Sequence, residues 1–407
     1  MTDEHTSDSK IPVTLVTGFL GSGKTTFIHR LLKERHGMRI AVLQNEFSSE
    51  MGIEKPVLSA GGASVFELPN GCLCCSLRNG IVEAVESILQ FKHKFDWLVV
   101  EAAGNVDPLE LVSNFWVDPE SQLVLDGVLT VTCPTVLCSI FSELSKDREI
   151  ILCSDGEGIK QEDATNNANR GMNHNAVSQR FKLLGNDTVD GKDMHELMAK
   201  QLSVADAIII NKIDRWDIFN AVQNNSTIVP SAEPDDKHAD GSDTVVPEKI
   251  KDLLKSINPN ARLIAASFCN VNLDVVMNLQ MFNASRILTF TSDDKAGHHH
   301  HEDSTKSHVF VKTSGQYSLA YVNDFISTLL WESGMSIYRC KGIFRAVKDC
   351  EMIAEPNGDT STFQLQSVGM TFEITEAAEV EIEDNRFLFI GPNLHDGHII
   401  NGLKLSQ

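Results

Sequence analysis

The 407-residue sequence predicts an α/β fold, a parallel sheet sandwiched by helices, followed by a smaller α+β domain at the C-terminal end. Three observations support this prediction. Short β-branched runs alternate with amphipathic segments in the first half of the chain, a glycine-rich turn directly follows the first run, and the pattern changes beyond a histidine-rich stretch near residue 300. Strands that alternate with helices form parallel sheets, because the helices cover both faces.

The individual elements of the first domain follow from the spacing of apolar residues. Residues 11–17 form a β-branched run, which indicates a buried strand. Residues 25–35 carry apolar side chains at helical spacing, which indicates a helix with one buried stripe, formed by Phe27, Ile28, Leu31 and Leu32. Further strands are expected at 39–43, 97–100 and 207–210, with a helix at 83–91.

Polar segments divide the chain. Residues 153–195 and 223–247 are rich in Asn, Asp, Gly and Ser, so we expect them to be surface insertions. Residues 286–307 are also polar and form the expected linker, so the predicted domains are 1–285 and 308–407. In the second domain the pattern predicts strands at 337–347, 361–372 and 386–390 and a helix at 322–331.

Composition excludes several classes of protein. With 35 Lys and Arg against 56 Asp and Glu, the net charge is −21, and both predicted domains are acidic. Neither offers the basic face that nucleic acid or an anionic membrane requires, so we expect neither partner. The most apolar stretch, 123–140, is interrupted by Asp126 and Pro134, and the N-terminal residues lack a signal-peptide pattern. We therefore expect a cytoplasmic protein.

The strongest motif is a glycine-rich loop between the first strand and the first helix. Its sequence, GFLGSGKT over 18–25, fits the Walker A pattern in full. Backbone N–H groups of such a loop surround a phosphate, Lys24 reaches the β and γ oxygens, and the Thr25 hydroxyl binds Mg²⁺. The alternative, a glycine turn followed by a chance Lys-Thr pair, fits the strand–turn–helix context less well. The predicted phosphate-binding residues are Gly18, Gly21, Ser22, Gly23, Lys24, Thr25 and Thr26.

A second motif indicates which base is bound. Asn211, Lys212 and Asp214 follow the apolar strand 207–210, where a P-loop GTPase has its base-recognition loop. An aspartate can accept hydrogen bonds from both N1 and N2 of guanine, a pairing that adenine cannot offer. The string alone could also be an ordinary helix N-terminus. After a Walker A loop, it favours GTP and GDP over adenine nucleotides.

Between these motifs, the apolar strand 97–100 ends in Glu101 and is followed by Gly104. This is typical of a Walker B element, in which Glu101 would hold Mg²⁺ or its water and the Gly104 amide would approach the γ-phosphate. Glu101 could instead merely end the strand. With Lys24 and Glu101 as the catalytic candidates and no evident arginine finger, we expect slow GTP hydrolysis.

Cysteines between the two Walker elements indicate a metal site. Of the nine cysteines, Cys72, Cys74 and Cys75 crowd into one motif, CLCC, which in a reducing compartment is typical of metal binding and not of disulfides. Three thiolates suit Zn²⁺ and leave one tetrahedral position open, while cobalt or nickel would accept similar ligands. Three small buried residues are the structural alternative. Further candidate ligands are Glu46, Glu50, His298, His299, His300 and His301. The two glutamates could equally be solvated loop residues, and the histidines a low-complexity part of the linker without a function.

The motifs together resemble the CobW-type metallochaperone GTPases, a group that includes the zinc-regulated GTPases. The resemblance rests on GFLGSGKTT, NEF, NGCLCC, EAAG, ADAIIINKID, RCKGIF, QSVG and NRFLFIGPNL. It implies a P-loop GTPase domain joined to a CobW C-terminal domain, often through a histidine-rich stretch. It also implies Zn²⁺ or cobalt bound by the three cysteines, with GTP state coupled to metal transfer to a client protein.

Departures from the family pattern fall in two places. The family usually has NEFGE, whereas Ser48 and Ser49 replace the Gly and Glu here. Near residue 131 an aspartate of the common pattern is absent and Cys133 is present. The N-terminal peptide by which some eukaryotic members engage methionine aminopeptidase is also absent, so the client stays unidentified, and a homo-oligomer that depends on nucleotide or metal stays open.

The sequence supports one mechanism and two alternatives. Cys72 to Cys75 lie between the segments that contact the γ-phosphate, so hydrolysis would alter metal affinity, and linkage makes this effect reciprocal. The alternatives are a regulatory GTPase with a structural metal site and a metal storage or buffering protein. An ATP-dependent kinase is a more distant possibility.

Overall fold

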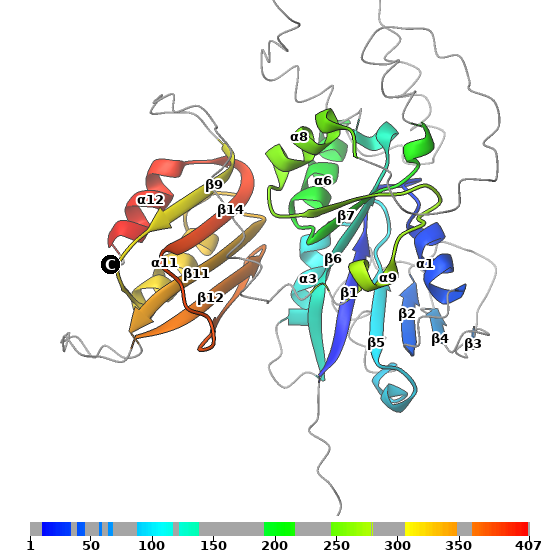
Figure 1. Cartoon of the computed structure of the whole chain (residues 1–407), viewed down its shortest axis with the longest axis horizontal. Helices are drawn as coiled ribbons and strands as arrows, with labels where there is room; N and C mark the ends of the chain where they lie inside the picture. The colour runs from blue at the N-terminus through cyan, green and yellow to red at the C-terminus, as the bar shows by residue number, and fades with distance from the viewer. Residues whose placement is uncertain are drawn as a thin grey trace, which may run out of the picture.

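The computed structural model describes residues 10–33, 39–44, 57–58, 64–67, 88–116, 122–137, 191–215, 246–277, 279, 306–347 and 360–405. These residues form two sheets, each with its own helices (Figure 1).

The first sheet has eight strands in the order β3-β4-β2-β5-β1-β6-β7-β8. Its pairs are parallel except β3–β4, which is antiparallel. The strands are β1 (Ile11–Thr17), β2 (Ile40–Gln44), β3 (Val57–Leu58), β4 (Ser64–Glu67), β5 (Trp97–Glu101), β6 (Leu123–Thr132), β7 (Ala207–Ile210) and β8 (Arg262–Ala265). Because β1 lies between β5 and β6, the loops that follow these three strands meet at one edge of the sheet.

Helices cover both faces of this sheet, as the alternation of side chains along the strands shows. Val13 and Leu15 of β1 pack with helix α3 (Pro108–Trp116), whereas Val16 points to the opposite face and packs with α1 (Lys24–Lys33). Along β7, Ile208 and Ile210 pack with the second pair of helices on the α3 face. That pair is α6 (Gly191–Ser203) and α8 (Glu248–Ile257), and α9 (Leu273–Val276) lies on the α1 face.

The second domain is a mainly antiparallel sheet with two helices (Figure 1). Its strand order is β13-β12-β11-β14-β9, with the short β10 pairing parallel to β11. The elements are β9 (Lys306–Thr313), β10 (Tyr317–Ser318), α11 (Leu319–Trp331), β11 (Arg339–Val347), β12 (Thr360–Val368), β13 (Thr371–Glu376), β14 (Asn385–Leu394) and α12 (Asp396–Leu405). Stacked and edge-on aromatic rings, including Phe344 and Phe387 at 5.3 Å between centroids, fill its core.

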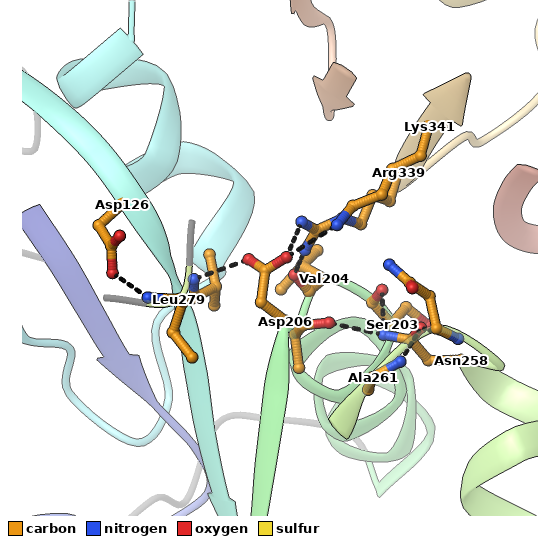
Figure 2. Close-up of polar contacts among 12 residues, drawn as sticks. Asp126, Ser203, Val204, Asp206, Asn258, Ala261, Leu279, Arg339 and Lys341 are labelled. Carbon is orange, nitrogen blue, oxygen red and sulfur yellow. Dashed lines mark hydrogen bonds and ion pairs between the residues drawn. The ribbon is translucent and has the colours of Figure 1, made fainter. Parts of the chain in front are cut away.

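An ion cluster buried between the two domains joins them (Figure 2). Arg339 and Lys341 of β11 reach Asp206, the residue that precedes β7, and Lys341 Nζ lies 3.0 Å from Asp206 Oδ1. The other oxygen of Asp206 accepts a hydrogen bond of 3.0 Å from the Val128 amide, and Arg339 also donates to the Val204 carbonyl. Burial would raise the pKa of Asp206, but the charges of Arg339 and Lys341 outweigh it and lower that pKa.

The predicted fold class is confirmed. The sheet with helices on both faces and the separate antiparallel C-terminal sheet are present, and the strand expected at 207–210 has those bounds. One local prediction was wrong: residues 361–372 form not one strand but β12 and β13, because the chain reverses at Gly369, which has φ +59°. The helix predicted at 83–91 lies mostly outside the described residues.

The predicted domain borders and insertions stay predictions. The C-terminal sheet begins with β9 at Lys306, inside the predicted linker 286–307, and α6 begins at Gly191, inside the predicted insertion 153–195. Most of both insertions lies outside the described residues. Among the described helices, none is both long enough and apolar enough to cross a membrane.

Replacing Asp206 by Ala is expected to destabilise the folded chain. It would leave Arg339 and Lys341 buried without their carboxylate, and breaking a buried ion pair in this way costs about 3–5 kcal/mol. Chemical denaturation would measure the free energy of unfolding, with Asp252→Ala, an exposed aspartate on α8, as the matched control. Equal stability of the two variants would show that the cluster does not hold the domains together.

Candidate functional site

The candidate site lies at the carboxyl ends of β5, β1, β6 and β7. Four connections leave the sheet there: 18–23 after β1, 102–107 after β5, residue 133 after β6 and 211–212 after β7. Ligands of open parallel sheets bind at this edge, because the loops leave a crevice where neighbouring connections run to opposite faces. The glycine-rich loop is at the centre of the four.

The glycine-rich loop folds back on itself through backbone conformations that favour glycine. Gly18, Gly21 and Gly23 have φ values of +136°, +75° and +116°. At Gly23 a Cβ would lie only 2.2 Å from Nδ2 of Asn211, so no larger residue fits. The loop ends where α1 begins at Lys24, and the free N–H groups of the first helical turn point to the place where an anion would bind.

Lys24 is buried within this loop. Its ammonium donates hydrogen bonds to the carbonyl oxygens of Gly18 at 2.6 Å and Phe19 at 3.3 Å. Burial lowers the pKa of Lys24 to about 8, although the charge of Glu101 raises it. The lysine is therefore held in the loop by its own backbone, where a phosphate could replace those carbonyls as its partner.

Thr25 and Glu101 form the pair that the sequence assigns to Mg²⁺. The Thr25 hydroxyl donates a hydrogen bond of 3.2 Å to Oε1 of Glu101, which is buried at the end of β5. A hydroxyl and a carboxylate side by side are hard oxygen ligands of the kind that Mg²⁺ prefers. The donor set therefore fits this ion.

Asn211 and Lys212 both contact the glycine-rich loop. Asn211, 1% exposed, donates from Nδ2 to the Ser22 carbonyl at 3.0 Å and accepts at Oδ1 from the Cys269 amide at 2.8 Å. Lys212, with φ +58°, donates to the Gly21 carbonyl at 2.6 Å. Asp214 lies in the short helix η2 (Ile213–Arg215) with an exposed side chain, so its carboxylate faces solvent.

A loop that the sequence did not single out completes this side of the site. Residues 266–270 follow β8, and Phe268 and Cys269 have φ values of +52° and +53°. Burial raises the pKa of the Cys269 thiol to about 12, and its Sγ donates to the Gly23 carbonyl at 3.4 Å. Phe268 instead projects its ring outward, 68% exposed.

Phe268 borders a hollow beside the start of α1. The hollow has a volume of about 580 Å³, and its walls are Thr25, Thr26, His29, Arg30, Lys33 and Phe268. The exposed Phe268 ring and the basic side chains of Arg30 and Lys33 thus share one hollow with Thr25, the predicted Mg²⁺ residue. Thr26, predicted from the Walker A pattern, lies in this wall.

Gly104 lies directly against the glycine-rich loop. A Cβ at Gly104 would meet the Leu20 amide nitrogen at 2.7 Å, so only glycine allows this approach. The carbonyl of Gly104 accepts a hydrogen bond of 3.1 Å from Nε2 of Gln201 on α6. The structure therefore brings together residues of all three nucleotide motifs, with Gln201 beside them, whereas Asp214 makes no contact with the other motifs among the described interactions.

The predicted metal site cannot be followed in the structure. Cys72, Cys74 and Cys75, the acids Glu46 and Glu50, and the histidines His298, His299, His300 and His301 all lie outside the described residues. Within the described ranges, no group of three or more His, Cys, Asp or Glu side chains is arranged to hold a metal. Cys133, which departs from the family pattern, is buried with Phe19 as a small apolar residue.

The fold and this edge of the sheet define the P-loop nucleotide-binding class. Comparison with known proteins narrows the class: the sequence model described as CobW/HypB/UreG, nucleotide-binding domain, matches residues 12–236, more than half of the chain. The chain therefore belongs to the CobW/HypB/UreG family.

Curated relatives match parts of the chain. Zinc-regulated GTPase metalloprotein activator 1 of Schizosaccharomyces pombe is 35% identical over 158 residues, which cover 37% of this chain and 38% of that protein. Zinc chaperone CobW of a Sinorhizobium species is 30% identical over 244 residues, which cover 58% and 60%. The chain thus spans less than two thirds of the length of these relatives.

A solved structure has the same fold. The crystal structure of Zn(II)-bound YjiA GTPase from E. coli superposes with a TM-score of 0.57 at 17% identity, over 98% of this chain and 99% of that one. The likeness covers both domains, so the arrangement of a parallel α/β domain followed by an antiparallel one is shared.

Nucleotide affinity is expected to fall as the pH rises through about 8. The free protein loses the Lys24 proton there, because burial lowers the pKa to about 8, and a neutral amine attracts phosphate poorly. Titration with a fluorescent GTP analogue between about pH 7 and 9 measures this effect, since the phosphates stay ionised throughout. Lys24→Arg, charged over this range, is the control, and an equally steep fall in that variant would contradict the assignment to Lys24.

Proposed function

We propose that this protein is a GTPase of the metallochaperone type, which binds GTP at the glycine-rich loop and couples its hydrolysis to the transfer of Zn²⁺, or cobalt or nickel, to a client protein. The observation that carries the proposal is the set of contacts around the loop made by Lys24, the Thr25–Glu101 pair and Asn211, which supports a Mg²⁺–nucleotide complex at this place.

Guanine is the proposed base because the exposed carboxylate of Asp214 can accept from N1 and N2 of guanine, whereas adenine offers no such pair. Lys212 and Asn211 hold that segment against the glycine-rich loop. Phe268 supplies an apolar surface next to the hollow beside α1. Together these contacts support GTP and GDP as ligands.

GTP hydrolysis depends more on charges placed around the phosphates than on a reacting side chain of the protein. Thr25 and Glu101 would hold Mg²⁺, which neutralises developing charge on the phosphates when it is bound. Lys24 places one positive charge beside the same phosphates, and the Gly104 amide is proposed to meet the γ-phosphate. The sequence has no evident arginine finger, and on that ground we propose slow turnover for the isolated protein.

The metal part of the proposal rests on Cys72, Cys74 and Cys75 and on the relatives. Two curated relatives are named zinc-regulated GTPase metalloprotein activator 1 and zinc chaperone CobW. The cysteines lie in sequence between β4 and β5, and β5 carries Glu101. A cysteine motif joined to that strand can change its geometry with the bound nucleotide, and this would change its affinity for the metal. The client protein would receive the metal when that affinity falls.

Binding of GTP and Zn²⁺ is expected to be reciprocal. If GTP changes the affinity for Zn²⁺ by some factor, Zn²⁺ must change the affinity for GTP by the same factor. Titration of a non-hydrolysable GTP analogue with and without Zn²⁺ measures this coupling, which in comparable systems amounts to about 5- to 150-fold. Identical dissociation constants in the two titrations would leave a GTPase whose metal is structural.

Two variants should separate the sites. Lys24→Ala is expected to abolish nucleotide binding and keep one Zn²⁺ on the thiolates, because the lysine is not near any predicted thiolate in sequence. The triple change of Cys72, Cys74 and Cys75 to Ser is expected to lose Zn²⁺ and keep GTP. Metal analysis and nucleotide titration of both proteins check this. Zinc retained by the triple variant would place the metal at other ligands.

A further inference from the structure

The turn that carries Gly104 is held by two neighbouring residues of α6. This turn, residues 102–107, joins Glu101 of β5 to helix α3 and is here called the β5–α3 turn. Gln201 donates to the Gly104 carbonyl at 3.1 Å, and Lys200 lies 3.2 Å from Oδ2 of Asp107. The middle of the turn and its C-terminal end are therefore both anchored on one helix.

The helix that provides these anchors is itself fixed on the sheet. The Gln201 carbonyl accepts a hydrogen bond of 2.6 Å from the Thr130 hydroxyl of β6, and the Gln201 side chain is 1% exposed. The other end of the turn is rigid too, because Oδ1 of Asp107 accepts the Leu109 amide at 2.9 Å and so begins α3. Consequently the position of Gly104 against Leu20 depends on what α6 contacts.

Lys200 also contacts the C-terminal domain. Its ammonium lies 5.6 Å from the ring centroid of Tyr338, within cation–π distance, and 3.2 Å from Oε1 of Glu196. Tyr338 is buried among apolar residues of the first domain and is hydrogen-bonded to Glu196. The same Lys200 side chain therefore touches the β5–α3 turn and the second domain.

We propose that Gln201 and Lys200 are positioning residues for Gly104, and that Tyr338 extends this anchor into the C-terminal domain. The C-terminal domain thereby sets the affinity for the γ-phosphate. The inference rests on the proposed function, in which the Gly104 amide meets that phosphate. GDP needs Lys24, Asn211 and Asp214 but not Gly104, so only the triphosphate depends on this anchor.

The test compares GTP with GDP in the full-length chain. Lys200→Met keeps the alkyl chain over Tyr338 and removes the charge, and Gln201→Met removes the donor to Gly104 at nearly constant volume. Affinities for a fluorescent non-hydrolysable GTP analogue and for fluorescent GDP are measured with Mg²⁺. Lys251→Met is the matched control, since Lys251 of α8 pairs only with the exposed Glu248 in the described contacts.

The expected result is a selective loss. The GTP analogue should bind about 2- to 30-fold more weakly to Lys200→Met and Gln201→Met, while GDP affinity and the Lys251→Met protein stay at the wild-type level. A merely structural role would weaken both nucleotides equally, and that outcome, like unchanged GTP affinity, would overturn the inference.

Tyr338 is tested by a double-mutant cycle. Tyr338→Leu alone should reduce the ratio of GTP affinity to GDP affinity. In the Lys200→Met background the same change should reduce that ratio no further, because Tyr338 acts on Gly104 through Lys200. Tyr338→Phe keeps the ring over Lys200 and should bind as the wild type does, so it is the control for loss of the ring. If the leucine variant does not fold, Tyr338→Met, which also removes the ring, takes its place in the cycle. Additive effects, or an unchanged affinity ratio when the ring is removed, would exclude Tyr338 from the proposal. If wild-type protein binds neither nucleotide, the proposed function fails first, and the inference falls with it.

Discussion

The side chain of Asn211 connects the two loops that border the phosphate site, and the rest of the site is placed relative to it. Both polar atoms of its buried amide are hydrogen-bonded, Nδ2 to the Ser22 carbonyl and Oδ1 to the Cys269 amide. A residue without this amide would leave two buried backbone groups unpaired, at about 1–3 kcal/mol each. The loop 266–270, with two successive residues at positive φ, is held by Asn211 at the Cys269 amide and by a hydrogen bond of the Asn270 amide to the Ser267 carbonyl.

Asn211 follows a four-residue strand that has a second buried polar anchor at its other end. Asp206 precedes β7 and binds Arg339 and Lys341 of the second domain, while Asn211 follows β7 and binds the glycine-rich loop. The strand spans about 13 Å and is fully buried. Polar partners at both ends also fix its register, since a slip by one residue would put an alanine in the place of the Asp206 carboxylate and Ile210 or Lys212 in the place of the Asn211 amide.

The parts of the site that follow from sequence are those in which neighbours along the chain act together. The loop 18–25 and the residues 211–214 are local motifs, so their positions after β1 and β7 followed once the strands were recognised. Gln201 and Gly104 are 97 residues apart, and Arg339 and Asp206 are 133 apart. The sequence around either partner does not mark such a pair, because polar and charged side chains such as these are usually exposed to solvent.

Phe268 and the β12–β13 reversal were missed for a different reason. Phe268 lies in a stretch, ASFCN, without any motif, and only its exposure beside the hollow sets it apart. The reversal at Gly369 interrupts a continuous β-rich run, and a single glycine is a weak turn signal next to Met370 and Thr371. Both features follow from tertiary surroundings, which decide backbone conformation at such positions.

The two routes from the nucleotide edge to the C-terminal domain differ in how readily they can change. The Asp206 cluster is almost fully buried, and separating its charges would leave them without water, so it acts as a fixed joint. The Lys200–Asp107 pair is partly solvated, with side chains 22% and 26% exposed, and such pairs break and re-form at little cost. A change at Gly104 can therefore reach the second domain through α6 while the joint at β7 stays closed.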